Sequence, residues 1–154
     1  MFLSLIIVSI VVGCKATDCP DGWLAYEGSC YLIGADDVHY TEAEHFCMQH
    51  NSHLVHVQSA EENNFLKGYF KTFVNGHNYW LGMTDDISEG LWKWNGNDER
   101  VEFFNWAPTE PQDSNNEDCA VFHMSLNFQW ADVQCKSDRR PICEKRETTD
   151  VIVG

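Results

Sequence analysis

The sequence is poor in basic residues. Lys and Arg together number 10 against 24 Asp and Glu in 154 residues, which gives a formal net charge of -14 at pH 7. Such a surface repels nucleic-acid phosphates and anionic lipid headgroups, so neither class of partner is expected. Internal repeats, low-complexity stretches and linkers rich in Pro, Gly or Ser are also absent. The chain therefore predicts one domain with a substantial core rather than two.

The signatures of common enzymes are missing as well. The sequence contains no Gly-x-Ser-x-Gly elbow, no His-Glu-x-x-His pair and no phosphate-binding loop. It has seven histidines, and the spacing of His53 and His56 could suggest a metal site. In a strand, however, residues three apart point to opposite faces, so these two rings are not expected to converge on zinc. We expect no enzymatic activity.

The N-terminus carries the longest apolar run. Residues 1–12 are almost wholly apolar, and small residues follow up to Ala16. The run is too short to span a bilayer and is typical of the apolar centre of a secretory signal peptide. We assign residues 1–16 to a signal peptide and expect a secreted, extracellular protein without membrane insertion. A bacterial lipoprotein signal ending at Cys14 is the alternative.

Cleavage after Ala16 would remove Cys14 and leave an even number of cysteines. The remaining six are Cys19, Cys30, Cys47, Cys119, Cys135 and Cys143. An even number in a secreted chain favours complete pairing, but six cysteines allow 15 connectivities. The residues alone leave this choice open.

Capping residues and hydrophobic periodicity predict two helices followed by short strands. Residues 23–33 alternate around Glu27-Gly28, which predicts a hairpin. Thr41 with Glu44, and Ser59 with Glu62, form capping boxes. These boxes predict helices over residues 41–49 and 59–70, and short strands are predicted over residues 53–57, 79–83, 91–94, 119–123, 129–133 and 141–144. This order favours an α+β fold with an antiparallel-rich sheet system.

Two acidic segments are candidates for binding a cation. One covers residues 84–90 and the other covers residues 110–119. The second overlaps the end of a long stretch, residues 95–116, that predicts an ordered functional loop. Calcium takes six to eight oxygen ligands, which carboxylates and side-chain amides supply. On composition alone, a solvated acidic loop is the favoured explanation of these segments.

Several short motifs then occur in one order along the chain. They are Cys19-Pro20-x-Gly22-Trp23, Glu44-x-x-Cys47, Ser59-Ala60-Glu61-Glu62-Asn63, Tyr79-Trp80-Leu81-Gly82-Met83, Asn105-Trp106 before Glu110-Pro111, Glu117-Asp118-Cys119, Trp130-x-Asp132, and Cys135 with Cys143. The ordered set resembles a C-type lectin domain of the long form. The resemblance implies a C-type lectin-like fold of two helices, antiparallel sheets and a long calcium-binding loop region, with residues 17–145 as the domain and 146–154 as a short tail.

The resemblance also implies the pairing of the cysteines and the calcium ligands. The disulfides would be Cys19–Cys30, Cys47–Cys143 and Cys119–Cys135. The sugar-binding calcium would be held by Glu110, Gln112, Glu117 and Asp132, beside a cis Pro111. An auxiliary calcium would be held by Asp85, Glu89, Asp113 and Asp118.

The sugar-binding site departs from the family pattern at two positions. Gln112 stands where the family has Asn or Asp, and it offers the same amide one methylene further out. Ala131 replaces the Asn of a Trp-Asn-Asp motif, which removes a calcium ligand and a donor to the sugar. We therefore expect weaker calcium and sugar binding than in a relative with the full motif. The acid-then-amide order of Glu110 and Gln112 favours mannose-type diols, with galactose left open.

Together these inferences predict a secreted, calcium-dependent lectin that recognises glycans, with a role in innate immunity. The alternative is a lectin fold that binds a protein or another surface and uses calcium for structure alone. One shallow site gives weak affinity, so effective binding requires multivalency. A homo-oligomer or clustering on a surface would each supply it.

Overall fold

The structure is a computed structural model that describes residues 16–112 and 116–147. Apart from Ala16, the expected signal peptide lies outside the described residues, as do residues 148–154 of the expected tail. The elements in chain order are β1 (Leu24–Tyr26), β2 (Ser29–Ile33), α1 (Tyr40–Gln49), β3 (His53–Leu54), α2 (Ala60–Phe73), β4 (Tyr79–Thr84), β5 (Lys93–Trp94), β6 (Cys119–His123), the 3-10 helix η1 (Met124–Leu126), β7 (Gln129–Val133) and β8 (Ile142–Arg146). In the part of the chain that the structure describes, no helix has the length and apolar character needed to span a membrane.

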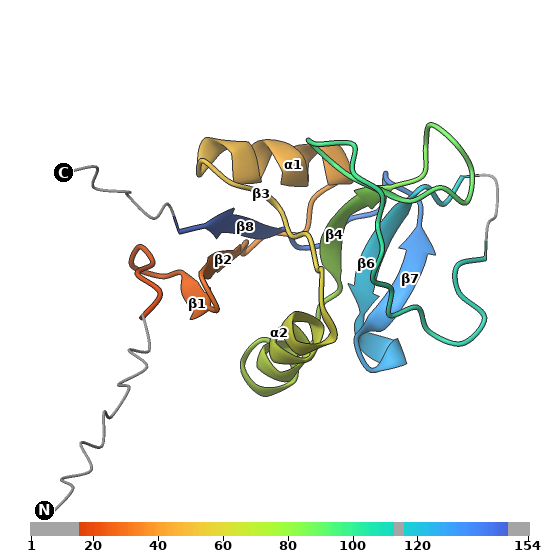
Figure 1. Ribbon diagram of the computed structural model, residues 1–154. Helices are drawn as coiled ribbons and strands as arrows, with labels where there is room; N and C mark the ends of the chain where they lie inside the picture. The colour runs from red at the N-terminus through yellow and green to blue at the C-terminus, as the bar shows by residue number, and fades with distance from the viewer. Residues whose placement is uncertain (1–15, 113–115, 148–154) are drawn as a thin grey trace, which may run out of the picture.

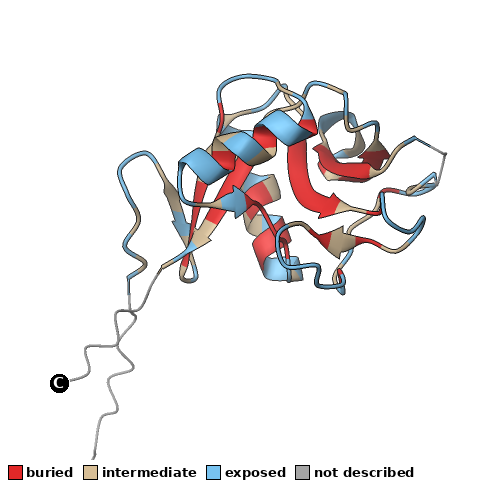
Figure 2. Ribbon diagram, turned by 90° about the horizontal axis from the view of Figure 1, so that it is seen from above, coloured by how far each residue is buried: buried red, intermediate tan, exposed pale blue. Residues whose placement is uncertain are grey.

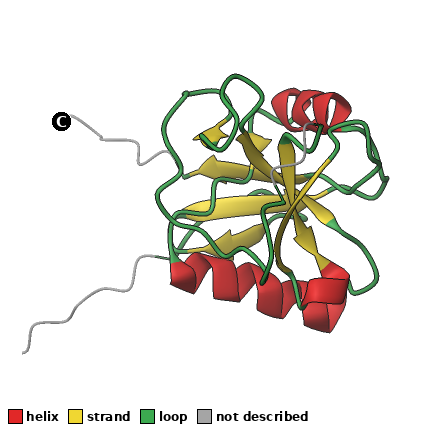
Figure 3. Ribbon diagram, turned by 90° about the vertical axis from the view of Figure 1, so that its right-hand side faces the viewer, coloured by secondary structure: helices red, strands yellow, loops and turns green. Residues whose placement is uncertain are grey.

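The strands form two antiparallel sheets. The first has the order β1-β2-β8-β3 and the second has the order β5-β4-β6-β7. In Figure 1 the first sheet lies on the left and the second on the right, with α1 above the strands and α2 below them; Figure 3 shows the strands between the two helices from the side. The long loops between β4 and β6 lie at the right-hand end of the molecule. The expected α+β fold is confirmed.

The central strands are buried on both faces, because a helix covers each side. Along β4, Tyr79 and Leu81 belong to the core cluster that includes Leu66 and Phe70 of α2, whereas Trp80 belongs to the cluster that includes residues of α1. This alternation follows from the two-residue period of a strand. It explains why the strand reads as a nearly continuous apolar run, and Figure 2 shows the buried strands beneath α1.

Three disulfides fasten the elements, and their pairing is the one that the resemblance implies. Cys47–Cys143 joins α1 to β8 across 96 residues of sequence. Cys119–Cys135 closes the β6–β7 segment, and Cys19–Cys30 holds the N-terminal segment to β2. The hairpin prediction is also confirmed: Glu27 and Gly28 have positive φ values of 43° and 81°, which suits the two-residue turn between β1 and β2.

The start of α1 differs from the prediction. The helix begins at Tyr40, one residue before Thr41, and the N-cap is His39 rather than Thr41. The Glu42 carboxylate accepts the N–H of His39 at 3.1 Å, so the acid that serves the first turn is Glu42 and not Glu44. The physical reason is tertiary: Tyr40 is buried and lies edge-on to the ring of Trp80 at 5.4 Å.

The strand predicted over residues 53–57 is shorter, because the chain changes partners after Leu54. Val55 donates to the carbonyl of Ile142 and accepts the N–H of Gly82, both at 2.9 Å, so it bridges β8 and β4. A Cβ on Gly82 would lie 2.5 Å from the carbonyl oxygen of Leu54, so only glycine permits this approach. At the other end of the chain, β8 continues to Arg146, one residue beyond the expected end of the domain.

Candidate calcium and carbohydrate site

The candidate sugar-binding loop is held against β7 by backbone hydrogen bonds. Ala107 donates its N–H to the carbonyl of Trp130 at 2.9 Å, and Glu110 donates to the carbonyl of Ala107 at 3.0 Å. The Glu110–Pro111 peptide bond is cis, as expected. These contacts bring Gln112 opposite Asp132 at the end of β7.

The structure brings together three of the four residues expected to bind sugar. The backbone N–H of Gln112 donates to both carboxylate oxygens of Asp132, at 3.0 and 3.1 Å. The side-chain amide of Gln112 donates to Oε1 of Glu110 at 3.1 Å. Asp132 is only 5% exposed, so its position is fixed by packing as well as by these bonds. Two carboxylates and one amide therefore face each other across the loop.

The electrostatics of this group centre on Glu110. Partial burial, a hydrogen bond with Asp132 and the negative charges of Asp132 and Glu117 raise the pKa of Glu110 to about 7, although the hydrogen bond from Gln112 opposes the rise. Glu117, the fourth expected ligand, is half-buried and lies near enough for its charge to act on Glu110. The site thus concentrates negative charge that repels itself.

Ala131, which replaces the Asn of the family pattern, lies within β7. Ala131 is 2% exposed and pairs with Val121 in the ladder between β6 and β7. Its methyl group supplies neither an oxygen ligand nor a hydrogen-bond donor beside Asp132. A buried methyl group therefore stands at the position where the family pattern has an amide.

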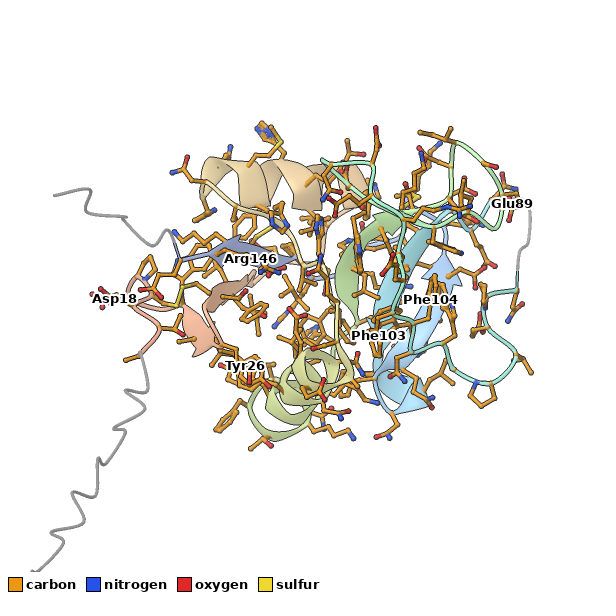
Figure 4. The ribbon with its side chains drawn as sticks, viewed as in Figure 1. Asp18, Tyr26, Glu89, Phe103, Phe104 and Arg146 are labelled. Atoms are coloured by element: carbon orange, nitrogen blue, oxygen red, sulfur yellow. A yellow bond between two sulfur atoms is a disulfide. The ribbon has the colours of Figure 1, made fainter. Side chains whose placement is uncertain are left out.

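The expected auxiliary ligands are only partly described. Asp85 is 3% exposed, its backbone N–H donates to the carbonyl of Asp118 at 3.2 Å, and its Oδ2 accepts the N–H of Gly90 at 2.8 Å. Glu89 lies on the same exposed turn, at the right-hand edge of Figure 4. Asp113 lies outside the described residues. The structure thus links Asp85 to Asp118 through the backbone, and Glu89 follows four residues after Asp85.

The chemistry of these donors suits calcium. Within residues 16–112 and 116–147, no three His, Cys, Asp or Glu side chains already form a metal-binding cluster. The group at Glu110, Gln112 and Asp132 nevertheless combines carboxylate and amide oxygens, which are the ligands that calcium prefers. A divalent cation would also relieve the repulsion that raises the pKa of Glu110. The residues present therefore fit calcium, with Glu117 as a further carboxylate.

The tryptophans near the site belong to the core. Trp80, Trp92, Trp94 and Trp130 are buried. Trp106 is half-buried and lies edge-on to Trp92 and Trp130, with ring centroids 5.0 and 6.1 Å away. These contacts make Trp106 a support beneath the loop.

The prediction that the rings of His53 and His56 lie apart is wrong. Their centroids are 4.1 Å apart, and His56 in turn stacks on Trp94 at 4.9 Å. The prediction assumed a continuous strand, but β3 ends at Leu54, so the alternation of faces ends there too. Sequence reasoning also missed the cleft that these rings line, because no local pattern shows where β3 stops.

Comparisons with known proteins agree with this architecture. A family described as the lectin C-type domain matches residues 36–145. A perlucin-like protein of Mytilus galloprovincialis is 33% identical over 142 residues, covering 89% of this chain and 91% of that protein. Asialoglycoprotein receptor 1 of Mus musculus is 37% identical over 141 residues, covering 87% of this chain and 47% of the receptor. The chain thus spans nearly all of the mussel protein but about half of the receptor.

Solved structures of several kinds share the fold. The carbohydrate-recognition domain of the mouse scavenger receptor C-type lectin has a TM-score of 0.76 and 33% identity, covering 83% of this chain and 96% of that domain. The cow CD23 carbohydrate-recognition domain, solved in the presence of a GlcNAc2Man3 oligosaccharide, has a TM-score of 0.74 and 26% identity. The match covers 84% of this chain and 97% of that domain. A calcium-independent type II antifreeze protein has a TM-score of 0.76 and 25% identity, and the match covers 87% of this chain and 98% of that protein. The fold therefore occurs both in a protein named as calcium-independent and in a type II antifreeze protein named as Ca2+-dependent.

Proposed function

Because the chain belongs to the C-type lectin domain family, we propose that it is a calcium-dependent carbohydrate-binding protein. The observation that carries this proposal is the convergence of Glu110, Gln112 and Asp132 on one loop. The family is a lectin domain rather than an enzyme family. Calcium held by these residues and Glu117 would offer coordination positions to two neighbouring hydroxyls of a sugar ring.

The protein side chains would form different hydrogen bonds with those hydroxyls. The Glu110 and Glu117 carboxylates accept hydrogen bonds from sugar O–H groups, and the amide nitrogen of Gln112 donates to a sugar oxygen. In the described structure that amide donates to Glu110. Binding a hydroxyl between Glu110 and Gln112 therefore replaces an existing internal hydrogen bond. This exchange limits the net gain in free energy.

We propose mannose-type diols as the preferred ligand, because Glu110 precedes the amide of Gln112. The longer reach of Gln112 moves the donor outward by one methylene relative to Asn. Ala131 gives the second hydroxyl no donor, and one missing hydrogen bond beside an ion costs roughly 1.5 to 3 kcal/mol. We expect weak binding of single sugars.

The test is retention of the refolded mature chain on mannose- and galactose-coupled resins. A working lectin is retained on one resin in calcium and released by both chelator and the free sugar. The Glu110→Gln variant is the matched control, since it keeps the side-chain shape and removes one charge. Retention that survives chelator, or equal retention of the variant, would contradict the proposal.

A second function is favoured by the lack of an amide at Ala131. The protein would keep calcium for structure and bind a protein or another surface through the same loops. The similarity to a calcium-independent antifreeze protein is consistent with such a use of the fold. A calcium-dependent rise in melting temperature without retention on either resin would support this second function over the first.

We also propose that the protein acts outside the cell, where its three disulfides are stable. Recognition of microbial glycans in innate immunity suits a weak site that becomes effective through many contacts. A homo-oligomer would provide these contacts. Sedimentation of the mature chain in calcium and in chelator measures its oligomeric state directly.

A further inference from the structure

One cleft among the described residues is lined by none of the expected calcium ligands. It has a volume of about 650 Å³ and runs between β3, the end of β8 and the turn after β5. This volume falls within the range of about 300 to 1,000 Å³ that is usual for small-molecule sites. Figure 4 labels Arg146, which lines the cleft, on the opposite side of the molecule from Glu89.

Two smaller clefts continue this one in both directions. One of about 440 Å³ shares Gln58 and Glu99 with it and extends to Phe103. The other, of about 240 Å³, shares Gln58 and Arg146 and extends to Tyr26. We call the three together the Gln58 groove. Its lining extends from Tyr26 to Phe103.

Aromatic rings occur at intervals along the Gln58 groove. Tyr26 at one end stacks on Phe65, with centroids 4.1 Å apart and planes 11° apart. His53 in the middle is exposed and lies on His56, which stacks on the buried Trp94. This support fixes the His53 ring as a platform for the apolar face of a sugar.

Planar polar side chains lie between these rings. The amide of Gln58 accepts a hydrogen bond from the guanidinium of Arg146 at 2.9 Å, which holds both groups in place. The Asn97 carboxamide accepts the N–H of Glu99 at 3.1 Å and lines the same cleft. Toward sugar hydroxyls a carboxylate can accept, a guanidinium can donate, and an amide can do both.

The charges of the Gln58 groove are nearly balanced. Arg100, Lys145 and Arg146 lie among the exposed acids Glu27, Glu99 and Glu102, and Glu62 in the lining is buried. The buried Glu144 is engaged internally, since it accepts from Ser29 Oγ at 2.9 Å and from the N–H of His56 at 3.0 Å. Neither a polyanion nor a polycation finds a complementary field here. The lining matches an uncharged, hydroxyl-rich chain.

We propose that the Gln58 groove is a second carbohydrate-binding site, which takes a linear, uncharged oligosaccharide without calcium. It is independent of the calcium loops and does not rest on the function proposed for them. A domain with two sites on different faces can engage two points of a glycan layer. This arrangement provides multivalency within one chain.

The test is NMR titration of the mature protein in chelator with two uncharged probes, chitopentaose and a linear mannopentaose. We expect at least one pentamer to shift the amide signals of residues 51–58 and 95–99, and to bind about tenfold more tightly than its monosaccharide, which corresponds to about 1.4 kcal/mol. The variant His53→Ala removes an exposed ring, so the fold should persist. His45→Ala, on the exposed face of α1, is the matched control.

Loss of these shifts in His53→Ala, with retention in His45→Ala and in Asp132→Asn, supports the second site. Absence of shifts in residues 51–58 and 95–99 with both pentamers overturns it. Shifts of the same size and affinity in wild type and His53→Ala also overturn it. Shifts at residues 110–112 and 132 upon adding monosaccharide and calcium report separately on the calcium site, so either proposal can fail alone.

Discussion

Gln112 and Asp132 are joined by a bifurcated hydrogen bond in which one backbone N–H donates to both oxygens of one carboxylate, at 3.0 and 3.1 Å. The contact ties the candidate calcium loop to the end of β7. The same carboxylate would then be a calcium ligand. Asp132 therefore has a structural role and an expected binding role, and substitutions can separate them.

We predict that Asp132→Asn and Asp132→Ala differ in unfolding free energy without calcium, but that both lose their response to calcium. The Asn oxygen still accepts from Gln112, so the unfolding free energy in chelator stays within about 1 kcal/mol of wild type. The Ala variant loses both acceptors, which costs about 1 to 3 kcal/mol. Both variants lose most of the calcium-induced rise in melting temperature. Denaturant melts in chelator and in calcium measure these effects, and an unchanged calcium response in either variant would contradict the assignment.

We predict that Ala131→Asn tightens sugar binding. A restored donor beside the ion is worth roughly 1.5 to 3 kcal/mol, or about 10- to 100-fold in affinity. Ala131→Leu has a similar shape without the amide and should not tighten binding. Calorimetry with mannose in calcium measures both variants. No gain from Asn would mean that the missing amide does not cause the weakness.

Gly82 lies where β4 approaches β3, whereas Gly68 lies in α2 with open space around it. The two glycines therefore make a matched pair of tests. A Cβ at Gly82 would meet the backbone of Leu54 at 2.5 Å, so Gly82→Ala should destabilise the fold by about 1 to 3 kcal/mol or more. Gly68 lies exposed within α2 with open space around its Cβ position, so Gly68→Ala should stabilise by about 0.5 to 1 kcal/mol. Denaturant midpoints measure both. A neutral Gly82→Ala would show that the two strands can separate freely.

We predict that His56 makes the protein sensitive to acid. Burial, followed by the neighbouring charges of His53 and Arg146, lowers the pKa of His56 to about 3, although its hydrogen bond to the Asn95 carbonyl opposes the shift. The folded pKa lies below the unfolded value of about 6.5, so the full stabilisation is present above pH 6.5. It is lost as the pH falls from about 6.5 toward 3, at about 1.4 kcal/mol for each pH unit.

The variant His56→Gln keeps an amide donor for Asn95 and cannot titrate. Its unfolding free energy should fall less steeply below pH 6.5 than that of wild type. His45→Gln replaces an exposed ring and should keep the wild-type slope. Chemical denaturation at a series of pH values gives the slopes. Equal slopes for His56→Gln and wild type would show that His56 is not the acid-sensitive group.

Local chemistry was enough to predict several elements. Glu27-Gly28 specifies the β1–β2 turn through its positive φ values. Ser59 caps α2 by accepting the N–H of Glu62 at 3.1 Å. Glu62, the acid of that expected capping box, does not bond to the N-cap N–H, however. Its carboxylate accepts from Tyr31 Oη at 2.7 Å and from the N–H of Gln58 at 2.9 Å. Short-range signals therefore locate an element but do not identify every partner within it.

Other features depend on contacts that a single sequence does not display. Residues 53–57 read as a strand, but the approach of Gly82 to Leu54 ends β3 after two residues. The stacking of His53 on His56 follows from that early end. The calcium ligands came from the resemblance, whereas composition alone allowed a solvated acidic loop. Only the fold shows that Gln112 reaches Asp132 across 20 residues of sequence.

Gly28 connects the two ends of the described chain. Its N–H donates to the Thr17 hydroxyl at 2.9 Å, and its carbonyl accepts the N–H of Glu147 at 2.8 Å. The β1–β2 hairpin that holds Gly28 lies at the left of Figure 1, and the loops between β4 and β6 lie at the right. A tether, a tag or a second domain attached at either end would therefore leave the calcium loops facing outward. Immobilising the protein through either terminus should present the same face to a ligand.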